Sequence, residues 1–373
     1  MEQQTGSRFT ATGHELWKSL FGDSRIYYHP PKRFGKLAVV PLAWRAAPLE
    51  ERLYLTFAEA RDEVRIEETG HVPGLRIRNR AAKPVLLLEG ESLQGGWQNR
   101  VVTISILVPK DAVVEIPVAC VEQGRWSPRW VAQRQAHRGS ATAEPWRRRA
   151  EREPEYLDPG DHAFESPPEL WEPGDFLFAK LKGRLSRDVS RAAREGSRFW
   201  GNQSTIWDEI SRKATSFRAR SRTGAMSDIF ERSAHTLEEY VHNLPLEQDQ
   251  IGFVAAIDHD PLGMELVDHP HTLRAVYPRL LRAYALEAIE EERGASRFPE
   301  RGLASESTAY SDRSFAVDDA VAFLAGLQKA SITVHPSIGL GEQLRITGNG
   351  LEGSALHALN GILHLSLFPK SHA

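Results

Sequence analysis

The sequence predicts an α+β protein with strand-rich segments near both ends of the chain and helices between them. Short runs of branched residues bounded by Gly, Pro or Asn follow one another in the first third of the chain. Apolar residues at spacings of three and four dominate the middle, and further strand-like runs close the chain. This order differs from the regular βαβ alternation of a doubly wound fold.

The N-terminal strand-rich region spans about residues 30–127. Its spacing of short runs is typical of an antiparallel β-sandwich or a barrel-like sheet. The expected strands are residues 37–42, 53–57, 75–79, 85–88, 101–108 and 113–121. We therefore expect this region to form a β-rich domain that carries the candidate pocket.

The rest of the chain divides into an excursion and a mixed region. Residues 128–180 are rich in Pro and Arg and predict a long surface excursion. Residues 181–368 predict an α+β domain with closing strands, and the pattern leaves open whether it packs with the first as one unit. Its expected elements are helices from about 181, at 227–244, 271–292 and 316–329, a hairpin at 251–257 and 262–267, and strands at 331–335, 343–347, 354–358 and 361–368.

Composition excludes several classes of protein. The chain has 373 residues, with 47 basic and 50 acidic side chains, so no large net charge recruits nucleic acid or anionic lipid. A single cysteine, Cys120, excludes an internal disulfide framework and a cysteine-rich zinc module. No apolar run approaches the length of a membrane span, and the first thirty residues lack a signal-peptide core. We expect a cytoplasmic protein without a membrane partner.

The densest polar string in an apolar context runs from Glu89 to Arg100, between two expected strands. An extended backbone would point the carboxylates of Glu89 and Glu91 to the same side. Gln98, Asn99 and Arg100 offer amides and a guanidinium fork, which suit sugar hydroxyls, carboxylates and phosphates. The alternative interpretation is a β-hairpin with a polar tip.

A second polar string, Cys120 to Trp126, ends a later strand and would lie beside the first string in a meander. Glu122 and Arg125 could act on a ligand or form a structural ion pair. Trp126 could stack on a base or sugar, or cover the sheet edge. Cys120 is expected to be a small core residue, because no adjacent cation or helix N-terminus favours its thiolate.

Basic and aromatic residues are concentrated between residues 125 and 222. Residues 180–222 contain twelve Lys or Arg side chains against four acids. Basic residues interleaved with tryptophans are typical of surfaces that bind RNA or single-stranded DNA. The alternative is a solvated helix face, because four arginines recur at helical spacing: Arg187, Arg191, Arg194 and Arg198.

Known metal and phosphate motifs are missing from the sequence. Aspartates and histidines cluster at 258–260 and 268–271, but turn formation and helix capping account for them, so we expect no metal site. The glycine-rich segments near 339 and 348 precede strands, whereas a phosphate loop precedes a helix. No cofactor is indicated.

The two polar strings together resemble the ARG- and rhodanese-phosphatase-superfamily-associated protein domain family. The resemblance is carried by residues 84–126, PVLLLEGESLQGGWQNRVVTISILVPKDAVVEIPVACVEQGRW. Shorter matches follow at 206–210, 223–226, 252–256, 283–285, 339–341 and 364–365. The resemblance implies a bacterial domain linked to ADP-ribosylglycohydrolases and rhodanese-phosphatases, in conflict systems or pathways of NAD derivatives. It implies no catalytic residue.

Our leading hypothesis is recognition of a nucleotide- or ADP-ribose-like ligand at residues 89–100 and 120–126. Arg100 and Arg125 would contact phosphates, and Gln98 and Asn99 would contact hydroxyls or amides. Trp126 or Trp97 would stack on a ring. The residues do not decide whether the protein is an enzyme. If it is, the best candidates for the general acid or base are Glu91 and Glu122. The alternative hypothesis is a non-catalytic module for nucleic-acid binding or assembly that uses residues 125–222. The oligomeric state is not indicated.

Overall fold

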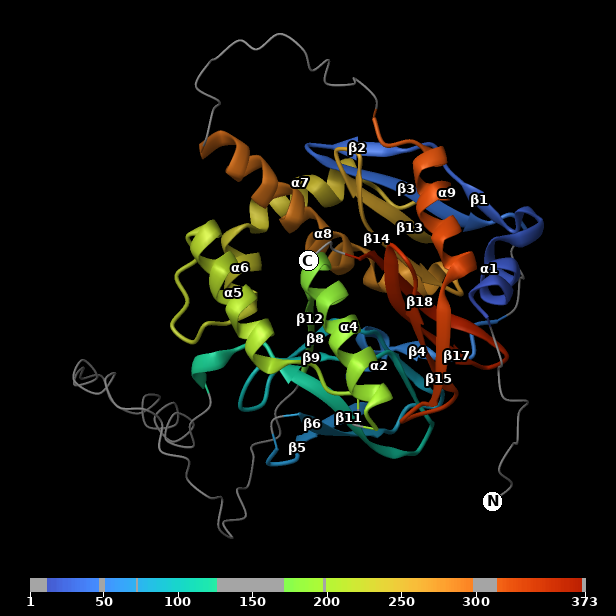
Figure 1. Cartoon of the computed structure of the whole chain (residues 1–373). Coiled ribbons are helices and arrows are strands. Elements are labelled where there is room, and N and C mark those ends of the chain that lie inside the picture. The colour runs from blue at the N-terminus through green and yellow to red at the C-terminus, as the bar shows by residue number, and fades with distance from the viewer. Residues whose placement is uncertain are drawn as a thin grey trace.

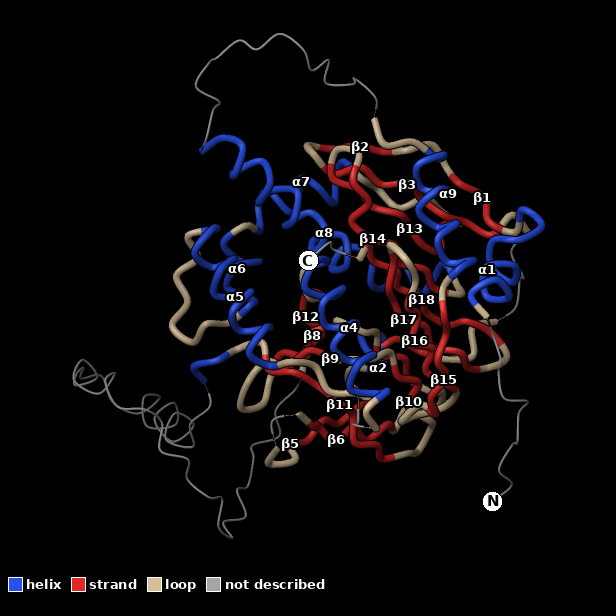
Figure 2. Tube along the Cα trace, in the orientation of Figure 1, coloured by secondary structure: helices blue, strands red, loops and turns tan. Residues whose placement is uncertain are grey.

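The computed structural model describes residues 12–46, 51–71, 73–125, 171–196, 199–297 and 314–370. Within these ranges the fold is α+β, as predicted, and its strands pair antiparallel except at one short contact. Strands occupy one part of the molecule, and helices α5 (Gln203–Phe217) and α6 (Met226–Arg232) lie at its side (Figures 1 and 2).

The largest sheet joins strands from both ends of the chain in the order β1-β3-β13-β14-β18-β17-β16-β15, with β2 also paired to β3. Its strands are β1 (Ile26–Tyr28), β2 (Lys32–Phe34), β3 (Leu37–Trp44), β13 (Gln250–Ile257), β14 (Asp260–Val267), β15 (Ser331–Pro336), β16 (Glu342–Thr347), β17 (Leu351–Ala358) and β18 (Gly361–Pro369). The predicted hairpin of β13 and β14 and the four closing strands are confirmed. Because β3 pairs with β13, the N-terminal strand region contributes to a sheet that the later strands complete. The division into domains stays a prediction.

Both faces of this sheet are buried, which explains the almost continuous apolar run of β3. Leu37 and Val39 enter one core cluster, while Ala38 and Val40 enter the other. Successive side chains of a strand point to opposite faces, so the two clusters lie on opposite sides of the sheet. Helices α1 (Gly13–Phe21) and α9 (Val317–Ala325) supply the second cluster.

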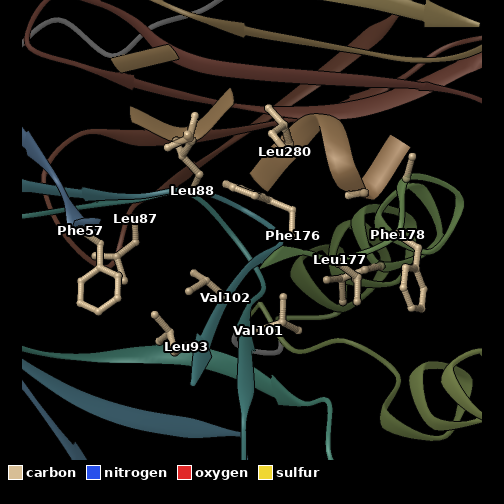
Figure 3. Packing of buried hydrophobic residues seen from close by; sticks show 14 of the residues in the cluster. Phe57, Leu87, Leu88, Leu93, Val101, Val102, Phe176, Leu177, Phe178 and Leu280 are labelled. Carbon is tan, nitrogen blue, oxygen red and sulfur yellow. The ribbon is translucent and has the colours of Figure 1, made fainter. Parts of the chain in front are cut away.

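Two smaller sheets carry most of the N-terminal strand region. One has the order β12-β8-β9-β11-β6-β5, and the other β10-β7-β4, in which β4 and β7 run parallel. Their strands are β4 (Leu55–Thr56), β5 (Val64–Glu68), β6 (Gly74–Asn79), β7 (Val85–Leu87), β8 (Glu91–Gln94), β9 (Arg100–Val102), β10 (Ile106–Val108), β11 (Val113–Cys120) and β12 (Glu172–Phe176). Their apolar side chains, among them Leu93 and Phe176, pack with Phe57 and Leu280 in the first cluster (Figure 3).

Two predicted strands differ from the observed ones for local reasons. The expected strand 53–57 is reduced to β4, because Thr56 and Glu59 form a capping box that begins helix α2 (Phe57–Ala60). The expected strand 101–108 is divided into β9 and β10, which belong to different sheets. Of the predicted excursion, residues 128–170 lie outside the described residues, and Glu172–Phe176 forms the edge strand β12.

The helical middle of the chain is more interrupted than its periodicity indicates. The predicted helix beginning near 181 is α4 (Ala179–Arg194), and a new helix, α5, begins after Asn202 caps its first turn. The predicted helix 227–244 divides at Ser233 into α6 and α7 (Ala234–Asn243). Helix α8 (Pro270–Arg297) completes the set. None of the helices in the described ranges is both long and apolar enough to cross a membrane.

Candidate functional site

The first polar string begins with a tight turn that separates its two carboxylates. Gly90 has a φ of +85°, a left-handed conformation that side chains rarely adopt. Glu89 therefore points toward Arg345 (Nη1 to Oε2, 3.4 Å), while Glu91 pairs with Arg279 (Nη1 to Oε1, 2.9 Å). The expectation that both carboxylates share one side is wrong, because the chain turns here instead of running extended.

Glu89 belongs to a buried charge network that consists of Glu89, Lys182, Glu265, Arg345 and His364. Each of these side chains is almost completely buried. Lys182 Nζ lies 2.7 Å from Glu265 Oε1, and His364 Nε2 lies 3.1 Å from Glu265 Oε2. The network joins α4, the nine-stranded sheet and the turn before β8, since these elements carry its members.

The network stabilises the ionised form of Glu265. Burial by itself raises the pKa of Glu265, but the Lys182 ammonium and His364 outweigh burial and lower this pKa to about 2. Burial lowers the pKa of Arg345, and the carboxylate of Glu89 opposes that effect. Each buried charge of the network thus lies beside a group of opposite charge.

Ser105, His364 and Glu265 are connected in the order of a nucleophile, base and acid. Ser105 Oγ lies 2.7 Å from His364 Nδ1, and the N–H of Glu89 donates to the same hydroxyl. A hydrolase would need this serine to meet a substrate. Ser105 is only 3% exposed, and none of the three residues lines either cavity described below. We interpret this chain of hydrogen bonds as part of the internal network.

The second polar string and the β8–β9 turn come together as predicted for a meander. Cys120 is paired with Arg100 in the β9–β11 register. Gln98 Nε2 donates to the carbonyl oxygen of Glu122 at 2.8 Å, and the N–H of Asn99 donates to Glu122 Oε2 at 3.1 Å. The predicted site residues Gln98, Asn99, Arg100 and Glu122 therefore form one cluster, which we call the turn cluster.

One predicted site residue, Glu91, stands apart from this cluster, and two others are not described. Glu91 pairs with Arg279 of α8, at the opposite end of β8 from the turn. The backbone of Arg125 belongs to a short 3-10 helix, η2 (Gln123–Arg125), but its side chain is outside the described part of the chain. Trp126 lies wholly outside the described residues.

The turn cluster is buried. The guanidinium of Arg100 is fully covered, with Nη1 2.9 Å from Gln98 Oε1 and Nη2 3.5 Å from Glu68 Oε2. The thiol of Cys120 donates to Gln98 Oε1 at 3.2 Å, and burial raises the pKa of Cys120. Cys120 is a core residue, as expected. The roles predicted for the cluster in ligand binding or catalysis remain predictions.

A cavity of about 410 Å³ adjoins this cluster, between η2, α5 and the connection from α5 to α6. We call it the arginine cavity. It is lined by Gln123, Trp207, Ile210, Ser211, Ala214, Thr215, Arg218, Ala219, Arg220, Ser221 and Gly224. Gln123 places the second polar string in its wall. Neither Arg218 nor Arg220 was among the predicted site residues. The signal was present, because residues 210–227 contain five basic side chains and no acid.

The arginines of this cavity differ from several other cations of the helical region. Arg184 pairs with Glu209, Arg187 with Glu352, and Lys213 with Glu287. Within the described residues, by contrast, Arg218 and Arg220 form no ion pair. Their guanidinium groups are available to an anionic ligand.

A second cavity, of about 440 Å³, lies between α4, α5 and α8. Most of the charged groups for which an ion pair is found here pair with one another, as the acids Glu209 and Glu290 show. Arg212 contacts Glu209 Oε1 at 2.6 Å and Glu290 Oε1 at 2.8 Å, and Lys213 contacts Glu290 Oε2 at 2.7 Å. This cavity is an ion-paired groove. No group of three or more potential metal ligands is found in the described ranges.

Comparison with known proteins supports the resemblance noted in the sequence. Residues 25–368 match the model of the family described as ARG and Rhodanese-Phosphatase-superfamily-associated Protein domain. No curated protein and no solved structure matches the chain significantly. Since the match covers nearly the whole chain, the protein belongs to the ARG and Rhodanese-Phosphatase-superfamily-associated Protein domain family.

Proposed function

We propose that this protein binds a nucleotide- or ADP-ribose-like ligand in the arginine cavity. The observation that carries the proposal is the pair Arg218 and Arg220, which line the cavity without carboxylate partners among the described residues. Three other cations of the helical region, Arg184, Arg187 and Lys213, are paired with acids. Arginine without a protein partner is suited to phosphate, because its planar fork donates two parallel hydrogen bonds.

The remaining lining of the cavity suits the rest of such a ligand. The indole of Trp207 offers a surface on which a base can stack, and Gln123 offers an amide to a ribose hydroxyl or a base edge. Ser211 and Ser221 add hydroxyl groups. The volume of about 410 Å³ falls in the range of about 300–1,000 Å³ that is usual for small-molecule sites.

The phosphate contact is thus assigned to Arg218 and Arg220 instead of Arg100, while the second polar string still contributes to the site. Arg100 was predicted to bind phosphate, but its guanidinium is fully buried against Gln98 and Glu68. Gln123 connects the predicted string to the cavity wall. Hydrolysis with Glu91 or Glu122 as general acid or base stays a separate prediction.

The alternative function, nucleic-acid binding by residues 125–222, draws less support from the described residues. An RNA surface needs many unpaired cations along a backbone track. Arg184, Arg187 and Arg191 instead contact acids of the same molecule. A small anionic ligand requires only the local pair at the cavity.

The test is isothermal titration with ADP-ribose, NAD, ATP and a short single-stranded RNA, each at two salt concentrations. Replacing Arg218 with Gly, or Arg220 with Ala, removes one guanidinium from the cavity. Loss of a hydrogen bond to a charged group costs about 1.5–3 kcal/mol, which is a loss of affinity of about 10- to 100-fold. The matched control is Arg222→Ala, because Arg222 is exposed, has no ion pair in the described residues, and does not line the cavity.

Three outcomes would contradict the proposal. One is an equal loss of affinity in Arg222→Ala, because this would indicate a diffuse charge effect. Another is the failure of every small ligand to bind. The third is binding of RNA alone with a steep salt dependence, which would favour the nucleic-acid function.

A further inference from the structure

We infer that Glu122 is a positioning residue that holds the arginine-bearing segment 218–225 in place, so that the affinity of the arginine cavity depends on it. This inference rests on the proposed function. In this role the buried carboxylate does not contact the ligand. It influences binding by fixing the position of Arg220 and Ser221.

The carboxylate of Glu122 joins two separate parts of the chain. Its Oε1 accepts a hydrogen bond from the hydroxyl of Thr223 at 2.7 Å. Its Oε2 accepts from the N–H of Asn99, in the β8–β9 turn, at 3.1 Å. Glu122 is 4% exposed, so these bonds form in a protected environment, where a hydrogen bond to a charged group is strong.

Backbone contacts continue the same attachment. The N–H of Gly124 donates to the carbonyl of Thr223 at 2.6 Å, and the N–H of Met226 donates to the carbonyl of Val121 at 2.9 Å. Glu122 and Ala225 form an antiparallel bridge. The carboxylate thus lies where the cavity segment meets the strand end.

The segment itself has little regular structure to fix its course. It begins at Arg218, whose φ of +52° ends α5, and it turns again at Gly224 with a φ of +66°. Between them, residues 219–224 lie outside helices and strands. A local hydrogen bond closes the turn, because Ser221 Oγ accepts from the N–H of Ala225 at 2.8 Å. Side-chain anchors therefore act together with these backbone contacts to fix where Arg220 lies.

The geometry favours positioning over a direct role for Glu122 in chemistry. Both carboxylate oxygens accept hydrogen bonds from the protein itself. Glu122 does not line the arginine cavity, whereas its neighbour Gln123 does. The carboxylate acts on the cavity through Thr223, which lies three residues from Arg220.

The experiment compares Glu122→Gln, Thr223→Val and Thr223→Ser in the full chain by two measurements. These are the affinity for ADP-ribose and the hydrogen exchange of amides 218–225 without ligand. We expect Glu122→Gln and Thr223→Val each to lower affinity about tenfold and to accelerate exchange in this segment. The double variant should lose little more than either single variant, because both remove the same bond. Thr223→Ser should retain the affinity of the unsubstituted chain, since serine keeps the hydroxyl that donates to Glu122.

The control and the outcomes separate the two proposals. Thr333→Val is the matched control, because Thr333 is exposed on edge strand β15, where valine is tolerated. Unchanged affinity and exchange in Glu122→Gln and Thr223→Val, with binding still lost in Arg218→Gly, would overturn the positioning role alone. No binding of ADP-ribose by the unsubstituted chain would overturn both proposals. Weaker binding by Glu122→Gln and Thr223→Val without faster exchange would also contradict the positioning role.

Discussion

The buried charge network and the arginine cavity differ in the environment that they give to arginine. Arg345 is completely buried and contacts Glu89, Ser186 and Ser190. Arg220 is exposed at a cavity and has no carboxylate partner in the described residues. A buried charge must be paired because its loss of hydration is expensive, whereas an exposed charge keeps its water until a ligand replaces it. The role of an arginine is therefore indicated by whether an acid of the same protein pairs with it, and residue type alone does not indicate it.

The two regions also differ in what they do for the fold. The buried network connects α4 to the nine-stranded sheet and to the turn between β7 and β8, which bear Lys182, Glu265 and Glu89. The cavity is closed on one side by a segment without regular structure. Substitutions in the network should therefore change stability, and substitutions at the cavity should change binding.

The largest expected effect is the loss of Lys182. Replacing Lys182 with Met leaves the charge of Glu265 buried beside His364 and hydroxyl groups. Removing one partner of a buried pair costs about 3–5 kcal/mol. Urea unfolding should show a lower midpoint with little change in slope. Lys180→Met is the matched control, since Lys180 lies on the same helix, is exposed and has no ion pair in the described residues. Equal stability of the two variants would contradict the importance of the network.

The second prediction uses pH to test the same pair. The pKa of Glu265 in the folded protein is about 2, below its ordinary value of 4.5, so the folded state favours the ionised form. Its contribution to stability is present above about pH 4.5 and is lost as the pH falls toward 2. We therefore expect the difference in unfolding free energy between the unsubstituted chain and Glu265→Gln to shrink over this interval. If this difference stays constant with pH, the charge of Glu265 does not stabilise the folded protein.

Much of the fold could be predicted because its strands are short apolar runs between turn residues. The hairpin of β13 and β14 follows from two such runs around Asp258. The exact strand ends at Thr56 and the break at Ser233 could not be predicted, because each depends on local capping or dihedral geometry. The pairing of β3 with β13 joins residues more than 200 positions apart, and alternation within either strand does not specify its partner.

The site could be predicted only to the level of its region. Neighbouring strands β9 and β11 bring Gln98 and Glu122 together, and this follows from a meander. The identity of the available arginines does not follow, because partners are distant in sequence. Arg345 and Glu89 are 256 residues apart, and Arg100 is covered by Glu68 from another strand. Only the folded chain shows which guanidinium groups remain unpaired.

The smallest expected effect is that of Arg218→Gly on stability. This variant tests directly whether an arginine of the cavity, unlike those of the buried network, is dispensable for the fold. The left-handed backbone of Arg218, with a φ of +52°, costs an ordinary residue about 1–2 kcal/mol. Glycine avoids this cost but loses about 0.5–1 kcal/mol of extra chain entropy on folding. We expect an unfolding free energy that is unchanged or higher by up to about 1 kcal/mol, measured by thermal or urea unfolding. Arg222→Gly is the control, because its φ is not positive and only the entropic loss applies. If Arg218→Gly destabilised the protein more than Arg222→Gly, the guanidinium of Arg218 would be stabilising the folded state. The arginine cavity would then resemble the buried network.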